Sequence, residues 1–152
     1  MAYVTKAIPK ATALLEPGEK VVALARYQLK GVATAQAVGG LAGAAIQAAR
    51  TRGDRNSAAA AGLTLRNRGT IAVTDRRVVV FSPSALGGYP KKLVDSVGPG
   101  TIVGAEPTGK GIAPMLTRIC IHYANGGESQ LDLFKRDGAD ELIQALTTFR
   151  GN

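Results

Sequence analysis

The sequence predicts a mainly β protein of the α+β class, in which about seven antiparallel strands are followed by one C-terminal α-helix. Apolar runs alternate with turn signals through residues 64–152, as expected of short strands. The pair Asn125-Gly126 is the strongest short hairpin signal in the chain. Residues 137–151 instead carry apolar side chains at helical spacing. A chain of 152 residues buries roughly 68–70% of its unfolded surface, so a single core suffices without disulfides or metals.

The first strand is expected over Glu19–Leu29, where β-branched and other apolar residues are concentrated. Residues 1–18 precede this strand and contain Pro9, Pro17 and Gly18. Proline and glycine favour turns and irregular backbone. We therefore expect residues 1–18 to form an N-terminal arm that leads into the first strand.

A hairpin is expected in the middle of the chain. Gly69–Thr74 alternates, with Ile71 and Val73 on one face, and Asp75-Arg76 provides a polar turn. Arg77–Ser82 follows with the β-branched and aromatic composition of a buried strand. The two runs are expected to pair with each other.

Four further strands are expected after this hairpin. Tyr89–Val97 and Thr101–Glu106 are the weaker candidates, and Leu116–Tyr123 and Glu128–Phe134 are joined by the Asn125-Gly126 turn. Alternation divides the last hairpin into a core face and an opposite face. The core face is expected to carry Ile119, Ile121, Tyr123, Leu131 and Leu133, and the opposite face Arg118, Cys120, His122 and Asp132.

The C-terminal helix is predicted from its cap and its apolar stripe. Asp137 is a suitable N-cap, Asp140 and Glu141 favour the first turn, and Gly151 stands where a C-terminal cap belongs. The apolar stripe consists of Ala139, Leu142, Ile143, Leu146 and Phe149. We expect this stripe to cover an open face or end of the sheet.

Two segments resemble a known family. Leu15–Glu19 has the sequence LEPGE before the first strand, and Gly69–Phe81 has the pattern of a strand, Thr-Asp-Arg-Arg and a second strand. Together with the Asn125-Gly126 hairpin and the closing helix, they resemble the bacterial pleckstrin-homology-like (PH-like) domains, close to the GRAM group. The resemblance covers residues 15–29 and 64–150. Its motifs specify architecture far better than function.

The resemblance implies a PH-like barrel or sandwich of about seven antiparallel strands capped by one helix. The expected organisation is an N-terminal arm at 1–18 and a domain at 19–150. An Ala-, Gly- and Arg-rich insert at 31–63 interrupts that domain after the first strand, where the family usually has a short loop. The insert is expected to be helical.

The first part of this insert carries no charge. Gly31–Ala49 lies between Lys30 and Arg50 and is long enough to cross about 30 Å of hydrocarbon as a helix. Its glycines and glutamines disfavour insertion. Three interpretations stay open: a helix packed on its own domain or another subunit, a membrane-surface helix, and a membrane span. Packing between subunits is expected to use Val32, Val38, Gly39, Leu41, Gly43 and Ile46.

Positive charge concentrates next to that segment. The chain has 19 Lys and Arg against 11 Asp and Glu, a net charge of +8. Seven arginines but only two acids lie between Arg50 and Arg77. In the resembled family the first hairpin loop holds phosphoinositide headgroups, and arginine suits phosphate because its planar fork donates two hydrogen bonds. The expected anion-binding residues are Lys30, Arg50, Arg52, Arg55, Arg66 and Arg68. The alternative is a solvated basic loop.

Catalytic and metal chemistry are not expected. Cys120 is the single cysteine and His122 the single histidine, which excludes a disulfide and a thiolate zinc cluster and leaves little room for a histidine-based metal site. Gly104–Gly111 matches G-x-x-x-x-G-K, but the Ser or Thr that should follow is missing and Pro114 disrupts the required helix. We interpret that segment as a Gly-rich loop between strands. No cofactor, metal, catalytic residue or small-molecule substrate is therefore expected.

The function predicted from the sequence is a non-enzymatic binding and assembly module. Its basic insert would dock on anionic lipid headgroups or an acidic partner, and its small-residue helix would pack subunits into a homo-oligomer. The alternative is a purely structural coat or scaffold protein without lipid binding. Nucleic acid is disfavoured because no helix presents a basic face and stacking aromatics are few. The N-terminus lacks the apolar run of a secretory signal, so the expected location is the cytoplasm, either free or peripheral to the membrane.

Overall fold

A seven-stranded antiparallel sheet dominates the computed structural model, which describes residues 2–29, 52–110 and 115–149. The strands are ordered β4-β3-β2-β1-β7-β6-β5. The elements are α1 (Ala2–Thr12), β1 (Val21–Leu29), β2 (Arg68–Thr74), β3 (Val78–Pro83), β4 (Pro90–Val97), β5 (Ile102–Lys110), β6 (Leu116–Tyr123), β7 (Glu128–Phe134), the 3-10 helix η1 (Lys135–Asp137) and α4 (Ala139–Thr148). The mainly β class with a closing helix is confirmed.

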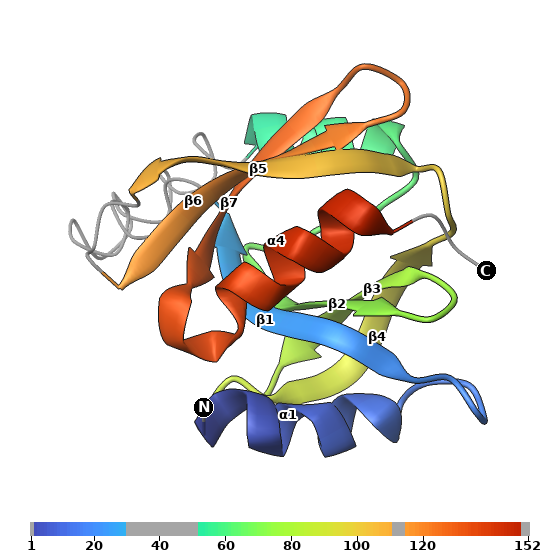
Figure 1. The fold of residues 1–152 in the computed structure, drawn as a ribbon, viewed down its shortest axis with the longest axis vertical. Coiled ribbons are helices and arrows are strands. Elements are labelled where there is room, and N and C mark those ends of the chain that lie inside the picture. The colour runs from blue at the N-terminus through green and yellow to red at the C-terminus, as the bar shows by residue number, and fades with distance from the viewer. Residues whose placement is uncertain (1, 30–51, 111–114, 150–152) are drawn as a thin grey trace.

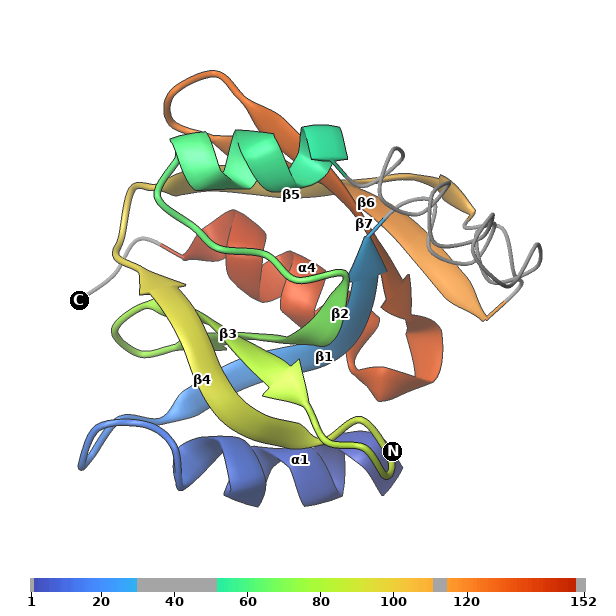
Figure 2. The ribbon, with the colours of Figure 1, turned by 180° about the vertical axis from the view of Figure 1, so that it is seen from behind.

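The sheet is strongly curved, and α4 lies in the opening between its two halves (Figure 1). Strand β1 joins the halves, because it pairs with β2 along most of its length and with β7 only through Tyr27, Gln28 and Leu29. Figure 2 shows the same arrangement from behind, with α1 beneath β4. The predicted hairpins β2–β3 and β6–β7 are both present.

The interior face of the sheet and α4 enclose the main core. The predicted core residues of the β6–β7 hairpin are all buried there, and Leu142 and Leu146 of α4 pack against them. The predicted helical stripe is therefore confirmed as the face that covers the sheet. The predicted N-cap is wrong: Asp137 lies in η1, and the N-cap of α4 is Gly138, whose φ of 92° suits glycine. Gly151 lies outside the described residues.

Helix α1 occupies the segment for which an irregular arm was expected. Tyr3, Ala7 and Ala11 recur every fourth residue and are buried against the outer face of the sheet. They contact a second core cluster that contains Leu24 and Phe81. The alternation expected for β2 is present, but both of its faces are buried because α1 covers the outer one.

The described part of the insert contains a helix at residues 52–60. Ala58 and Leu63 are fully buried in the main core. Asp54 accepts hydrogen bonds from the Gln130 amide at 2.9 Å and, through its carbonyl, from the Ser129 hydroxyl at 2.7 Å. The helix thus covers the part of β7 that extends beyond its pairing with β1.

Residues 104–110 correct one expectation. They belong to the continuous strand β5, paired with β6 as far as Lys110, and do not form a loop. The G-x-x-x-x-G-K match is therefore mostly strand. Among the described residues, no helix combines the length and the apolar character needed to cross a bilayer.

The two segments that carried the family resemblance contact each other. Glu19 has a fully buried side chain and receives two hydrogen bonds from Arg77, from Nε and Nη2, both at 2.9 Å. The Thr74 hydroxyl donates to the same carboxylate at 2.7 Å. Arg77 also reaches Ser96 of β4 at 3.0 Å. These contacts join the entry to β1 with the β2–β3 turn and with β4.

Candidate functional site

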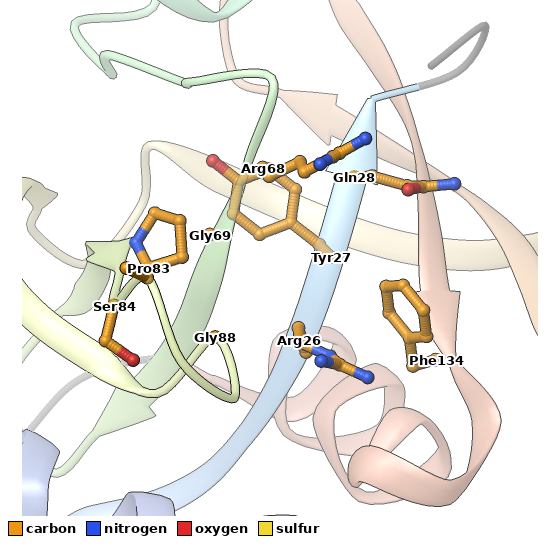
Figure 3. Close-up of a pocket in the computed structure, with 10 residues that line it drawn as sticks. Arg26, Tyr27, Gln28, Arg68, Gly69, Pro83, Ser84, Gly88 and Phe134 are labelled. Atoms are coloured by element: carbon orange, nitrogen blue, oxygen red, sulfur yellow. The ribbon is translucent and has the colours of Figure 1, made fainter. Parts of the chain in front are cut away.

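A basic pocket opens on the outer face of the sheet, where β1, β2 and the β3–β4 loop meet (Figure 3). Its volume is about 350 Å³. The residues that line it are Arg26, Tyr27, Gln28, Arg68, Gly69, Pro83, Ser84, Ala85, Gly88 and Phe134. We call this site the basic pocket because its charged lining residues are both arginines.

The strand register brings the two arginines to one face. Arg26 and Gln28 alternate with the interior residues Ala25 and Tyr27 on β1. Across the β1–β2 pair, Gln28 lies opposite Arg68, which is exposed. No acidic side chain among the described residues forms an ion pair with Arg68. Its guanidinium is therefore available to an external anion.

Arg26 is held in place by its neighbours. Its Nη2 lies 2.9 Å from Oδ2 of Asp137, and its guanidinium carbon lies 4.2 Å from the ring centre of Phe134 and 5.3 Å from that of Tyr3. About a third of the side chain stays exposed. Its Nε is buried and has no hydrogen-bond partner among the described residues. The pocket is thus lined by a guanidinium whose position is fixed and part of which stays exposed.

Helix α1 supports the loop that forms the opposite wall. The Tyr3 hydroxyl lies 2.6 Å from the Thr70 hydroxyl and donates to the Gly88 carbonyl at 3.0 Å. Burial raises the pKa of Tyr3 to about 12, so it remains a donor at neutral pH. The Tyr3 ring stacks on Tyr89, with ring centres 5.3 Å apart. The start of the β3–β4 loop is closed by Ser84, whose hydroxyl donates to the Leu86 carbonyl.

The tip of this loop presents an apolar side chain to solvent. Leu86 is 87% exposed and lies between pocket residues Ala85 and Gly88. Lys91 and Lys92 follow on β4 and are exposed. An exposed leucine at a loop tip suits the boundary between lipid headgroups and acyl chains, and exposed lysines suit an anionic surface.

The structure places the predicted anion-binding residues in different regions. Arg68 lines the basic pocket, whereas Arg66 contacts Tyr27 through its backbone and has an exposed side chain outside the lining. Arg52 and Arg55 belong to the helix at residues 52–60 and are also absent from the lining. The two remaining predicted residues of this set, Lys30 and Arg50, lie outside the described residues.

The predicted self-assembly residues cannot be placed, since all of them lie outside the described residues: Val32, Val38, Gly39, Leu41, Gly43 and Ile46. Sequence reasoning missed Arg26. Its signal was a single charged residue at an outward position of an otherwise apolar strand.

Comparison of the chain with protein-family models, curated proteins and solved structures gave no match. The basic pocket and its surroundings therefore carry the functional argument.

Proposed function

We propose that the chain is a non-enzymatic binding and assembly module of the PH-like, GRAM-related type, which docks on anionic lipid headgroups through the basic pocket. The fold assignment is supported by the number of antiparallel strands and by α4, which closes the chain and packs on the sheet; the sheet itself is open, where the resemblance implies a barrel or sandwich. The sequence alone pointed to the basic insert as the contact with lipid. The proposed contact is now the basic pocket.

The observation that carries the proposal is the combination of Arg26 and Arg68 with the exposed Leu86. A phosphate in the pocket would accept hydrogen bonds from the exposed nitrogens of the Arg26 and Arg68 guanidinium groups. Leu86 would enter the headgroup region, and the exposed Lys91 and Lys92 of β4 would add to the attraction towards an anionic surface. The module would thus bind peripherally from one side.

The test is flotation of the full chain with vesicles, either zwitterionic only or containing phosphatidylserine and a phosphoinositide. We expect binding only to the anionic vesicles, with loss at high salt because screening weakens surface attraction. Arg68→Ala should weaken binding about fivefold, the equivalent of ~1 kcal/mol per basic residue. Leu86→Asp should weaken it further, because a carboxylate replaces the inserting side chain.

The matched control is Arg76→Ala. Arg76 lies in the turn at the other end of β2 and forms an exposed ion pair with Glu16 at 3.2 Å. Arg76→Ala removes the same charge as Arg68→Ala. If lipid binds in the basic pocket, the Arg76→Ala variant should therefore bind vesicles nearly as well as the wild-type chain. If Arg68→Ala and Arg76→Ala weaken vesicle binding equally, binding depends on the net charge and not on the basic pocket. If the chain shows no salt-sensitive binding to anionic vesicles, lipid docking is excluded. The alternative function, a structural coat or scaffold protein, would then be favoured.

The assembly part of the proposal rests on the uncharged segment at residues 31–49. Replacement of this segment by a short Gly-Ser linker spares the core residues Ala58 and Leu63. We expect light scattering to show an oligomer for the full chain and a monomer for this variant. A monomeric full chain would contradict assembly, and an oligomeric variant would place the interface elsewhere.

A further inference from the structure

A second cluster of polar side chains lies on the outer face of β5, β6 and β7, and none of its members lines the basic pocket. Cys120 and His122 are two residues apart on β6 and share this face, as predicted. Glu106 of β5 lies opposite Cys120, and Glu128 of β7 lies opposite His122. Three neighbouring strands therefore bring a thiol, an imidazole and two carboxylates together.

The distances assign a role to each nitrogen of His122. Nε2 lies 2.9 Å from Oε1 of Glu106, and Nδ1 lies 3.6 Å from Oε2 of Glu128. With Nε2 protonated and donating to Glu106, the lone pair of Nδ1 is free for another partner. Ligand atoms of Cys120, His122 and Glu128 all lie within 4.8 Å of one another. One metal ion could lie between them after small side-chain rotations.

We propose that Cys120, His122 and Glu128 bind a zinc ion through Sγ, Nδ1 and a carboxylate oxygen, with Glu106 orienting the imidazole as a positioning residue. Sulfur, imidazole nitrogen and carboxylate oxygen are the three donor types that zinc accepts. A carboxylate on the far nitrogen of a ligating histidine is a recurrent partner in zinc sites. No metal site was expected because the chain has a single cysteine and a single histidine. That expectation left out sites in which carboxylates supply further ligands.

Burial and charge suit a divalent cation. Cys120 is buried, while the His122 and Glu128 side chains are about 39% and 57% exposed. The ion could therefore enter from solvent and keep a water as its fourth ligand. Zinc binds cysteine as the thiolate, so its binding would release the Cys120 thiol proton to solvent. A thiolate and one carboxylate would match the charge of the ion.

The experiment is a titration of the metal-free, reduced full chain with Co²⁺, followed by optical spectroscopy. We expect a thiolate-to-cobalt charge-transfer band and the visible bands of a four-coordinate site, at one equivalent. Zn²⁺ should abolish both by displacement, because zinc binds N and S sites more tightly than cobalt does. Absence of the charge-transfer band in the wild-type chain would overturn the proposal.

Variants separate the ligands from the positioning residue. Cys120→Ala should abolish the charge-transfer band, and His122→Gln, at a half-exposed position, should weaken cobalt binding at least tenfold while the circular dichroism spectrum stays unchanged. Glu106→Gln should retain the band but weaken binding about 10- to 100-fold. The control Glu141→Gln removes an exposed carboxylate of α4 and should have no effect.

Two outcomes would contradict the assignment. One is unchanged cobalt binding by folded His122→Gln, and the other is equal weakening by Glu141→Gln and Glu106→Gln, which would indicate general electrostatic attraction. This zinc site does not depend on the proposed lipid function. Vesicle binding of His122→Gln should equal that of the wild-type chain, so the two proposals fail separately.

Discussion

The Glu19 carboxylate has the most strongly perturbed acidity among the described carboxylates. Hydrogen bonds from Arg77 lower the pKa of Glu19 to about 2. Burial acts in the opposite direction and raises this pKa, whereas the hydrogen bond from Thr74 lowers it further. A carboxylate whose pKa is lower in the folded than in the unfolded chain stabilises the fold at neutral pH. That stabilisation is complete above the unfolded pKa and is lost as the pH falls from about 4.5 towards 2.

Glu19→Gln tests this contribution. We expect it to lower the free energy of unfolding at pH 7 by on the order of 2–3 kcal/mol, with the difference from wild type shrinking as the pH falls towards 2. Urea denaturation at several pH values measures both. Glu16→Gln, which affects an exposed acid of the same segment, is the control. A difference that stays constant with pH would show that the effect is steric and not electrostatic.

Some residues of the site could be predicted from the sequence, and others could not. Arg68 was predicted as an anion ligand because it belongs to a visible run of arginines, and it does line the basic pocket. Arg26 was not predicted, because strand alternation identifies an outward position but not what lies across the sheet from it. Asp132 lies on the outer face as predicted, but its carboxylate is fully buried there and accepts two hydrogen bonds from Arg118, which strand alternation alone does not reveal.

At the scale of elements, the strands were predictable and the first helix was not. Alternation and turn residues located all seven strands, most of them to within a few residues. Helix α1 escaped because two of its three buried contact residues are alanines, Ala7 and Ala11, and because Pro9 argued against a helix. Its burial depends on a sheet face formed much later in the sequence, which no local pattern specifies.

Tyr3→Phe tests the link between α1 and the basic pocket. The change removes the hydroxyl that contacts Thr70 and Gly88 and keeps the ring that stacks on Tyr89. We expect a loss of about 1–2 kcal/mol of stability, together with faster proteolysis in the β3–β4 loop. Thermal denaturation and limited proteolysis measure these effects. Unchanged proteolysis at Leu86 would show that the loop does not depend on α1.

Gly138 controls the junction between η1 and α4. Its φ is 92°, and a Cβ atom there would collide with the Leu24 carbonyl of β1. We expect Gly138→Ala to destabilise the fold by about 1–3 kcal/mol or more, since backbone strain and the collision act together. Chemical denaturation checks this. Gly53→Ala, at a helical glycine with open space around it, should be neutral or stabilising.

At the scale of the whole molecule, the total of 19 Lys and Arg overstates the number of positive side chains available for binding. Among the described arginines of residues 52–77, Arg76 forms an ion pair with Glu16 and Arg77 forms one with the buried Glu19. Outside that segment, Arg26 pairs with Asp137 and still lines the basic pocket. The positive surface relevant to a partner is therefore decided by pairing and position, which composition does not report.

The narrow contact between β1 and β7 has a consequence for how the chain folds during its synthesis. Helix α1 and strands β1 to β4 are connected mostly by neighbours in sequence order, whereas Leu29 must meet Leu131, about 100 residues later. Contacts of such long range slow folding, on the order of milliseconds to seconds for all-β domains. On the ribosome, the first half of the sheet could assemble early, but its core face would stay uncovered until β7 and α4 emerge. Residues 128–148 thus decide when the nascent chain stops exposing apolar surface, and a chain terminated before β7 would leave the core face of the first strands uncovered.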